Sequence, residues 1–126
     1  MQILIVDDNI MDRRSIQFII EKRLQISPKT AKDGLDAINK IKSTNFDIII
    51  TDIVMPNIDG IELVQYLKTN SPDSSVIAIT GNNPYYLEIM NKLGVELLLT
   101  KPIDPNQLIE MIASISSIKS NSTFVH

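Results

Sequence analysis

The sequence predicts an α/β domain in which helices cover both faces of a parallel β-sheet. Short apolar segments rich in strand-forming residues alternate with longer segments whose apolar residues recur at helical spacing. The alternation repeats five times through short connections, with no Pro/Ser-rich linker and no internal repeat. This pattern is typical of parallel strands that are joined by right-handed helical crossovers.

Five strands are expected, at residues 2–6, 27–31, 48–52, 76–79 and 96–99. The third is the clearest, because Ile48, Ile49 and Ile50 form an uninterrupted run of strand formers. A short apolar run of this kind suits a strand that is buried on both faces. The second strand is expected near an edge of the sheet, because Pro28 lacks the N–H that a ladder would use.

Five helices are expected to alternate with these strands, and four of them have residues at their ends that suit helix capping or termination. These end residues are Asn9, Asp33, Pro84, Gly94, Asp104 and Pro105. The residues expected to face the sheet are Ile16, Ile19, Ile20, Leu24, Leu35, Ile38, Ile41, Leu63, Val64, Leu67, Leu87, Met90, Leu93, Leu108, Ile112 and Ile115. Phe18 and Phe46 are also expected in the core, whereas Asp12 lies largely on the polar side of the first helix.

Length and composition fit one globular domain. The chain has 126 residues, of which 44% are hydrophobic and 21% charged. Residues 1–118 are expected to form the domain. Residues 119–126 belong to a Ser- and Asn-rich end that starts at Ser116, and they are expected to be a disordered tail or the start of a linker.

Charge and composition also exclude several classes of function. The net charge is −3 without a basic cluster, which argues against direct nucleic-acid binding by this domain. The absence of cysteine excludes disulfides, thiolate nucleophiles and zinc–cysteine sites. No apolar segment approaches the roughly 18 residues of a membrane span, and no signal peptide is recognisable. We therefore expect a cytoplasmic location and no membrane association.

Polar residues follow four of the predicted strands at the point where each strand ends. The first strand ends in Asp7 and Asp8, the third in Asp52, the fourth in Thr80 and the fifth in Lys101. Each residue alone has an ordinary explanation as a cap, a turn residue or a solvated side chain. In a parallel sheet, however, all these ends lie at the same edge, where ligands bind in open α/β sheets. We therefore expect the five side chains to converge on one crevice.

Three carboxylates in one crevice require compensation. Two unit charges about 4 Å apart repel by roughly 4 kcal/mol at an effective dielectric constant near 20. Either one carboxylate is protonated or a cation binds, and hard oxygen ligands favour magnesium, calcium or manganese. A divalent ion beside a lysine and a hydroxyl suits a phosphoryl group. A carboxylate in this crevice could itself be the nucleophile and form an aspartyl phosphate.

The motifs occur in the order and spacing of a known family. They are 3–9 (ILIVDDN), 47–56 (DIIITDIVMP), 59–60 (DG), 80–81 (TG) and 101–102 (KP). On these residues the chain resembles a response-regulator receiver domain of two-component systems, of the chemotaxis-receiver type. The resemblance implies a flavodoxin-like (βα)5 three-layer sandwich with strand order 2-1-3-4-5.

The resemblance also implies a phosphoryl-accepting and metal-binding site. Asp52 would be the phosphoacceptor. Asp7, Asp8, Asp52 and the backbone carbonyl of Val54 would hold Mg²⁺, with Asp8 the more direct ligand of the first two and Mn²⁺ as an alternative ion. Thr80 and Lys101 would contact phosphoryl oxygens, and the peptide bond after Lys101 is expected to be cis.

Partners and output are implied in the same way. The phosphoryl group would come from a histidine kinase or a histidine phosphotransfer protein. The face built from residues 84–93, 96–99 and 105–115 would then switch towards a downstream output protein or domain, with Asn82, Tyr85 and Tyr86 near its entrance. A homodimer through the same face is left open. The domain would be no ordinary enzyme, but would assist its own phosphorylation and dephosphorylation.

Two positions depart from the family pattern. Leu98 stands three residues before Lys101, where the family usually carries the aromatic residue whose rotamer follows the threonine. Val54 is apolar, where many relatives have a polar side chain that can orient an attacking water. The first departure calls for a switch without this aromatic residue, and the second predicts slow loss of phosphate.

Two other functions compete with the phosphorylated receiver. One is a receiver-like interaction module that never takes phosphate, which Leu98 alone favours. The other is an aspartyl-nucleophile phosphohydrolase of the haloacid-dehalogenase kind. Its nucleophile would lie on the first strand with a second aspartate two residues later, but Asn9 occupies that position after Asp7.

Overall fold

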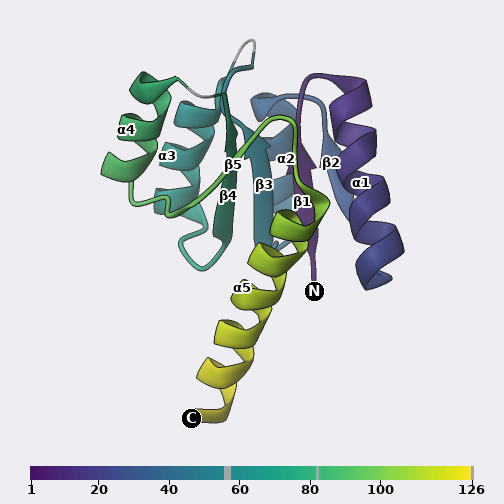
Figure 1. The fold of residues 1–126 in the computed structure, drawn as a ribbon. Coiled ribbons are helices and arrows are strands. Elements are labelled where there is room, and N and C mark those ends of the chain that lie inside the picture. The colour runs from purple at the N-terminus through teal and green to yellow at the C-terminus, as the bar shows by residue number, and fades with distance from the viewer. Residues whose placement is uncertain (56–57, 82, 126) are drawn as a thin grey trace.

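A single five-stranded parallel sheet forms the centre of the molecule in this computed structural model (Figure 1). The structure describes residues 1–55, 58–81 and 83–125, with side chains as far as Ile118. The strands are β1 (Ile3–Val6), β2 (Lys29–Ala31), β3 (Ile48–Asp52), β4 (Ser75–Thr80) and β5 (Leu97–Thr100). Their order in the sheet is β2-β1-β3-β4-β5, so the predicted order and the edge position of β2 are confirmed.

Five helices cover the two faces of the sheet. They are α1 (Ile10–Leu24), α2 (Gly34–Ser43), α3 (Gly60–Asn70), α4 (Pro84–Lys92) and α5 (Pro105–Val125). Helices α1 and α5 pack on one face, and α2, α3 and α4 pack on the other (Figure 1). The predicted flavodoxin-like three-layer sandwich is therefore confirmed.

The central strands supply side chains to both layers of the core, which explains their continuous apolar runs. Ile48 and Ile50 of β3 point into the core beneath α1 and α5, and Ile49 points into the core beneath α2 and α3. All three side chains are fully buried. The last two residues of β3, Thr51 and Asp52, are polar although buried, and the strand carries Asp52 to the edge of the sheet.

Polar side chains begin the helices at that edge, as the sequence predicts for three of them. Asn9 accepts hydrogen bonds from the backbone N–H groups of Met11 and Asp12, and thereby caps α1. Asp33 caps α2 in the same way, and Asp104 caps α5. These caps fix where each helix starts relative to the strand that precedes it.

Gly60 allows α3 to start directly against the end of β3. Its N–H donates a hydrogen bond to the carbonyl oxygen of Ile53 at 2.9 Å. A Cβ atom at residue 60 would overlap the backbone of Ile53 and lie 2.6 Å from the carbonyl oxygen of Asp52. Only glycine permits this approach, and the approach holds the backbone beside Asp52 in place.

Two core predictions are wrong. Leu35 is 52% exposed, because α2 turns its small residues Gly34 and Ala37 towards the protein interior. Phe18 is 60% exposed, because α1 packs through Ile16 and Ile20. Small residues let a helix lie close to the sheet, which a search for large apolar residues overlooks.

The C-terminal segment also differs from its prediction. Helix α5 continues to Val125, so the backbone is helical through most of residues 119–126, which were expected to be a disordered tail. Whether these residues also begin a linker stays a prediction.

Among the described residues, no helix has the length and apolar character that crossing a membrane requires. Pro56, part of a predicted motif, and Asn82, expected near the entrance of the output face, lie outside the described residues.

Candidate functional site

Strand register brings the predicted polar residues to one edge of the sheet. Asp52 is the last residue of β3 and lies opposite Ile79 of β4, so Thr80 follows one position beyond it. Thr80 in turn lies opposite Thr100 of β5, which precedes Lys101. Asp7 directly follows β1, which pairs with the other side of β3. The register therefore produces the convergence that the sequence predicts.

Three carboxylates form a cluster at this edge. One carboxylate oxygen from each of Asp7, Asp8 and Asp52 lies within 4.8 Å of the other two. Asp7 is completely buried and Asp52 is 8% exposed, whereas Asp8 faces solvent. Charges at such separations repel strongly outside bulk water. The cluster therefore favours any cation that can enter from the side of Asp8.

Burial raises the pKa of Asp7, and the nearby charge of Asp52 adds to this effect. Two interactions oppose it: the backbone N–H of Asn9 donates to Asp7 Oδ1 at 2.9 Å, and the Lys101 ammonium attracts the carboxylate. The other oxygen, Oδ2, is buried and accepts no hydrogen bond from the described residues, although Lys101 Nζ lies 3.4 Å away. Asp7 therefore presents one oxygen without a hydrogen bond in the cluster.

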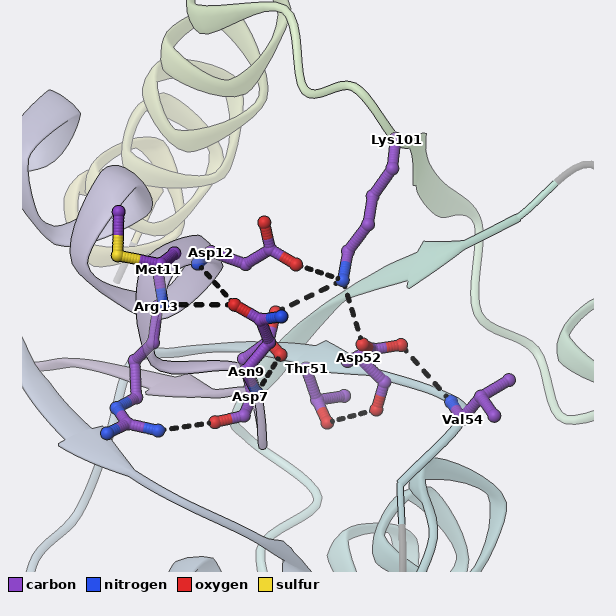
Figure 2. Close-up of polar contacts among 9 residues, drawn as sticks. All are labelled: Asp7, Asn9, Met11, Asp12, Arg13, Thr51, Asp52, Val54 and Lys101. Carbon is purple, nitrogen blue, oxygen red and sulfur yellow. Dashed lines mark hydrogen bonds and ion pairs between the residues drawn. The ribbon is translucent and has the colours of Figure 1, made fainter.

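Lys101, which follows β5, extends its side chain towards the carboxylates of Asp12 and Asp52 (Figure 2). Its Nζ donates hydrogen bonds to Asp12 Oδ2 at 2.8 Å and to Asp52 Oδ2 at 3.0 Å. Burial alone would lower the pKa of Lys101, but these hydrogen bonds and the charges of Asp52 and Asp7 raise it well above its ordinary value. The side chain is therefore a fixed positive charge over Asp52. The peptide bond after Lys101 is cis, as predicted.

Asp52 is held through both carboxylate oxygens. Oδ2 accepts the hydrogen bond from Lys101, and Oδ1 accepts one from the backbone N–H of Val54 at 3.1 Å (Figure 2). The Val54 side chain is 57% exposed beside it. Because Asp52 is positioned from two sides and remains partly accessible, it is the carboxylate of the cluster best placed to react with a group from outside.

Thr80 is buried at the end of β4, with 2% of its surface exposed. Its Oγ1 has no hydrogen-bond partner within the part of the chain that the structure describes. A buried hydroxyl without a partner is costly, by about 1–3 kcal/mol. Within that described part of the chain, Thr80 is therefore a polar group without a partner at the edge where the carboxylates gather.

The donor set fits a hard divalent ion. Among the described residues it consists of carboxylate oxygens, one of them on Asp7 and without a hydrogen bond, and it contains neither sulfur nor imidazole. Mg²⁺ prefers such ligands and keeps several waters, which suits a site that is open at Asp8. The residues that could hold the ion are Asp7, Asp8 and Asp52, as predicted. The ligand role of the Val54 carbonyl stays a prediction.

Two residues near this site were missed by sequence reasoning. Asp12 was placed on the polar side of its helix, but its carboxylate contacts Lys101. Arg13 Nη1 donates a hydrogen bond to the carbonyl oxygen of Asp7 at 2.8 Å. One signal could have found them: both lie in the first turn of α1, and helical side chains lean towards the N-terminus, here towards the strand ends.

The fold and this site together define a receiver-type α/β domain: a 2-1-3-4-5 parallel sheet with an aspartate, an acid pair, a threonine and a lysine at its carboxyl edge. Comparison with known proteins gives the family. The family model of the response regulator receiver domain matches residues 3–113. The chain therefore belongs to the response regulator receiver domain family of two-component systems.

Individual proteins agree with this assignment. The chain is 35% identical over 113 residues to the transcriptional regulatory protein FlgR of Helicobacter pylori, covering 89% of this chain and 29% of FlgR. It is 28% identical over 117 residues to the CAI-1 autoinducer sensor kinase/phosphatase CqsS of Vibrio cholerae, covering 90% of this chain and 17% of CqsS. The chain thus spans less than a third of the length of either protein.

Solved structures agree in fold along nearly the whole chain. The crystal structure of the N-terminal domain of protein WS1339 from Wolinella succinogenes is 32% identical, with a TM-score of 0.88 over 97% of this chain and 98% of that one. The chemotaxis protein CheY4 of Vibrio cholerae is 26% identical, with a TM-score of 0.80 over 90% of this chain and 97% of that one.

Proposed function

We propose that this domain accepts a phosphoryl group on Asp52 and passes the resulting change to an output partner. The observation that carries the proposal is the double anchoring of Asp52, by the Lys101 ammonium on Oδ2 and by the Val54 N–H on Oδ1, beside the carboxylates of Asp7 and Asp8. A nucleophile held in this way can meet an incoming group without further ordering.

The transfer forms one bond and breaks another. A carboxylate oxygen of Asp52 attacks the phosphorus of a phosphohistidine on a kinase or a phosphotransfer protein, and an acyl phosphate forms. The P–N bond breaks, and its electron pair returns to the imidazole of the donor. Mg²⁺, or Mn²⁺ in its place, when bound by Asp7, Asp8, Asp52 and the Val54 carbonyl, supplies positive charge for the phosphoryl oxygens.

Lys101 and Thr80 would receive the phosphoryl oxygens. Lys101 already carries its charge beside the attacked carboxylate. Thr80 has a hydroxyl without a hydrogen-bond partner among the described residues, which a phosphoryl oxygen would satisfy. Movement of Thr80 towards the phosphoryl group would shift the segment that leads into α4, and with it the face formed by α4, β5 and α5. Leu98 of β5 is aliphatic, so the shift would travel through the backbone and the loop.

The partners follow from the same chemistry. A histidine kinase or a histidine phosphotransfer protein would supply the group to this domain in the cytoplasm, and an output protein or domain would read the α4–β5–α5 face. The name of FlgR as a transcriptional regulatory protein and that of CqsS as a sensor kinase/phosphatase support a place in two-component signalling. Residues 1–118 would act as the domain, with dimerisation through the same face as one form of output.

The test compares the wild-type domain with Asp52→Asn by NMR during titration with MgCl₂ and beryllofluoride, a phosphoryl mimic. In the wild type we expect saturable shifts of the Asp52, Thr80 and Gly81 amide signals. We expect no such response to beryllofluoride in Asp52→Asn. A wild-type domain that binds Mg²⁺ but ignores beryllofluoride would contradict the proposal and favour a module that never takes phosphate.

A further inference from the structure

Asp12 lies outside the set of site residues expected for the family, yet its carboxylate is the nearest of the three that form ion pairs with Lys101. Asp12 Oδ2 is 2.8 Å from Nζ, compared with 3.0 Å for Asp52 Oδ2 and 3.4 Å for Asp7 Oδ2. Figure 2 shows the Asp12 side chain reaching from α1 towards Lys101, on the side away from Val54. We infer that Asp12 is a positioning residue that holds Lys101 in the unmodified domain and opposes phosphorylation of Asp52.

The ammonium group of Lys101 has only three N–H donors. In the unmodified domain three carboxylates surround it, from Asp7, Asp12 and Asp52. A phosphoryl group on Asp52 adds acceptor oxygens and further negative charge at the same place. Nζ donates hydrogen bonds to Asp12 and Asp52 and lies 3.4 Å from Asp7, so a phosphoryl oxygen would compete with these carboxylates for the ammonium charge.

Asp12 is the partner that can leave most easily. Its side chain is 42% exposed, whereas that of Asp52 is 12% exposed and that of Asp7 is fully buried. Water can therefore replace Lys101 at Asp12 but cannot do so at Asp7. A cavity of about 260 Å³, lined by Asp12, Ser15 and Ile103 among others, lies next to the ion pair and gives the side chain room to turn away.

Two consequences of opposite sign follow from the charge of Asp12. Its carboxylate adds negative charge near the cluster of Asp7, Asp8 and Asp52, which favours Mg²⁺. The same charge repels an anionic phosphoryl group and competes with it for Lys101. If Asp12 had only a structural role, its removal would weaken the binding of both Mg²⁺ and the phosphoryl group. Opposite changes in the two affinities therefore identify Asp12 as a residue that acts through its charge.

This inference rests on the proposed function, and its test separates the two. Mg²⁺ affinity is measured by titration without any phosphoryl mimic, and beryllofluoride affinity at saturating Mg²⁺, both by NMR. Asp12→Asn keeps the size of the side chain and removes its charge. We expect Mg²⁺ to bind about threefold more weakly and beryllofluoride about threefold more tightly, as a single, partly screened charge allows. Asp12→Ala should change both affinities in the same directions.

Two matched variants complete the design. Asp12→Glu restores the charge on an exposed side chain that can still reach Lys101, and should resemble the wild type. Glu21→Gln removes a carboxylate from the same helix, where it contacts Gln17 rather than Lys101, and should change neither affinity. Unchanged or weaker beryllofluoride binding in Asp12→Asn would overturn the inference and leave the proposed function intact. A wild type that binds no beryllofluoride would overturn both.

Discussion

Asp7 is a carboxylate that the fold encloses completely, and its charged form is costly unless a cation lies beside it. Burial is the largest influence on its pKa and raises it, and the attraction of Lys101 at 3.4 Å compensates only in part. The folded domain therefore holds the Asp7 proton more tightly than the unfolded chain does. In the absence of metal, Asp7 lowers stability progressively as the pH rises through its raised pKa.

Asp7→Asn should accordingly stabilise the metal-free domain. At pH 7 in EDTA we expect the free energy of unfolding to rise by about 1–2 kcal/mol, because an amide can accept the Asn9 N–H without a buried charge. The gain should shrink as the pH falls towards the ordinary aspartate pKa of 3.8. Urea denaturation between pH 4 and 8 measures it, with Glu110→Gln on the surface of α5 as the control. A variant less stable than the wild type at pH 7 would refute this view of Asp7.

The Val54 side chain should affect the lifetime of the acyl phosphate. It is apolar, 57% exposed, and belongs to the residue whose N–H binds Asp52 Oδ1. Val54→Asn adds a polar group that can orient an attacking water, so we expect decay to accelerate by up to about tenfold. Val54→Ala, which stays apolar, should decay within about twofold of the wild type. Decay is timed by loss of the phosphoryl label after donor removal, and equal rates in the two variants would count against a water-orienting role.

At the scale of elements, the start of α3 against the end of β3 keeps the Asp52 segment in place. Gly60→Ala should cost about 2 kcal/mol or more, because the new methyl group would meet the backbone of Ile53 and Asp52. Gly81→Ala is the matched control, since no atom lies within 4 Å of its new Cβ and the change should be close to neutral. Urea denaturation compares the two variants, and equal stabilities would contradict the close approach.

Element order could be predicted from the sequence because each strand and helix has its own local pattern. The run Ile48–Ile50 identifies β3, and Asn9 and Asp33 mark helix starts through the side-chain caps that the structure contains. It was harder to predict which side chains of each helix face the sheet. Leu35 and Phe18 are exposed because neighbouring residues give a closer fit, and that fit depends on the facing element.

The convergence of Asp7, Asp52 and Lys101 could be predicted because it depends on strand ends alone, and parallel register carries those ends to one edge. The Asp12–Lys101 contact could not, since it depends on the direction of a side chain in the first turn of a helix. Thr80 was placed correctly at the edge, but only the structure shows that its hydroxyl has no hydrogen-bond partner among the residues it describes.

At the scale of the whole molecule, we expect the first part of α5 to be required for folding and the part after Ile118 to add little to stability. Leu108, Ile112 and Ile115 of α5 are buried in the core beneath α1. A chain ending at Ile118 should therefore keep the unfolding free energy of the full chain to within about 1 kcal/mol. A chain ending at Gln107 should fail to fold, because each lost apolar side chain contributes about 2 kcal/mol. Urea denaturation distinguishes the outcomes, and a large loss of stability after truncation at Ile118 would contradict the predicted domain boundary.

The most direct test of the central claim is the intact mass of the domain after incubation with MgCl₂ and phosphoramidate, followed by borohydride reduction to locate any acyl phosphate. We predict that the wild type gains the mass of one phosphoryl group, that reduction marks Asp52, and that neither Asp52→Asn nor wild type in EDTA gains mass. The claim that Asp52 accepts the phosphoryl group would be contradicted if the wild-type mass stayed unchanged with phosphoramidate and also with a phosphohistidine donor. A phosphoryl group that still forms on Asp52→Asn would contradict it too.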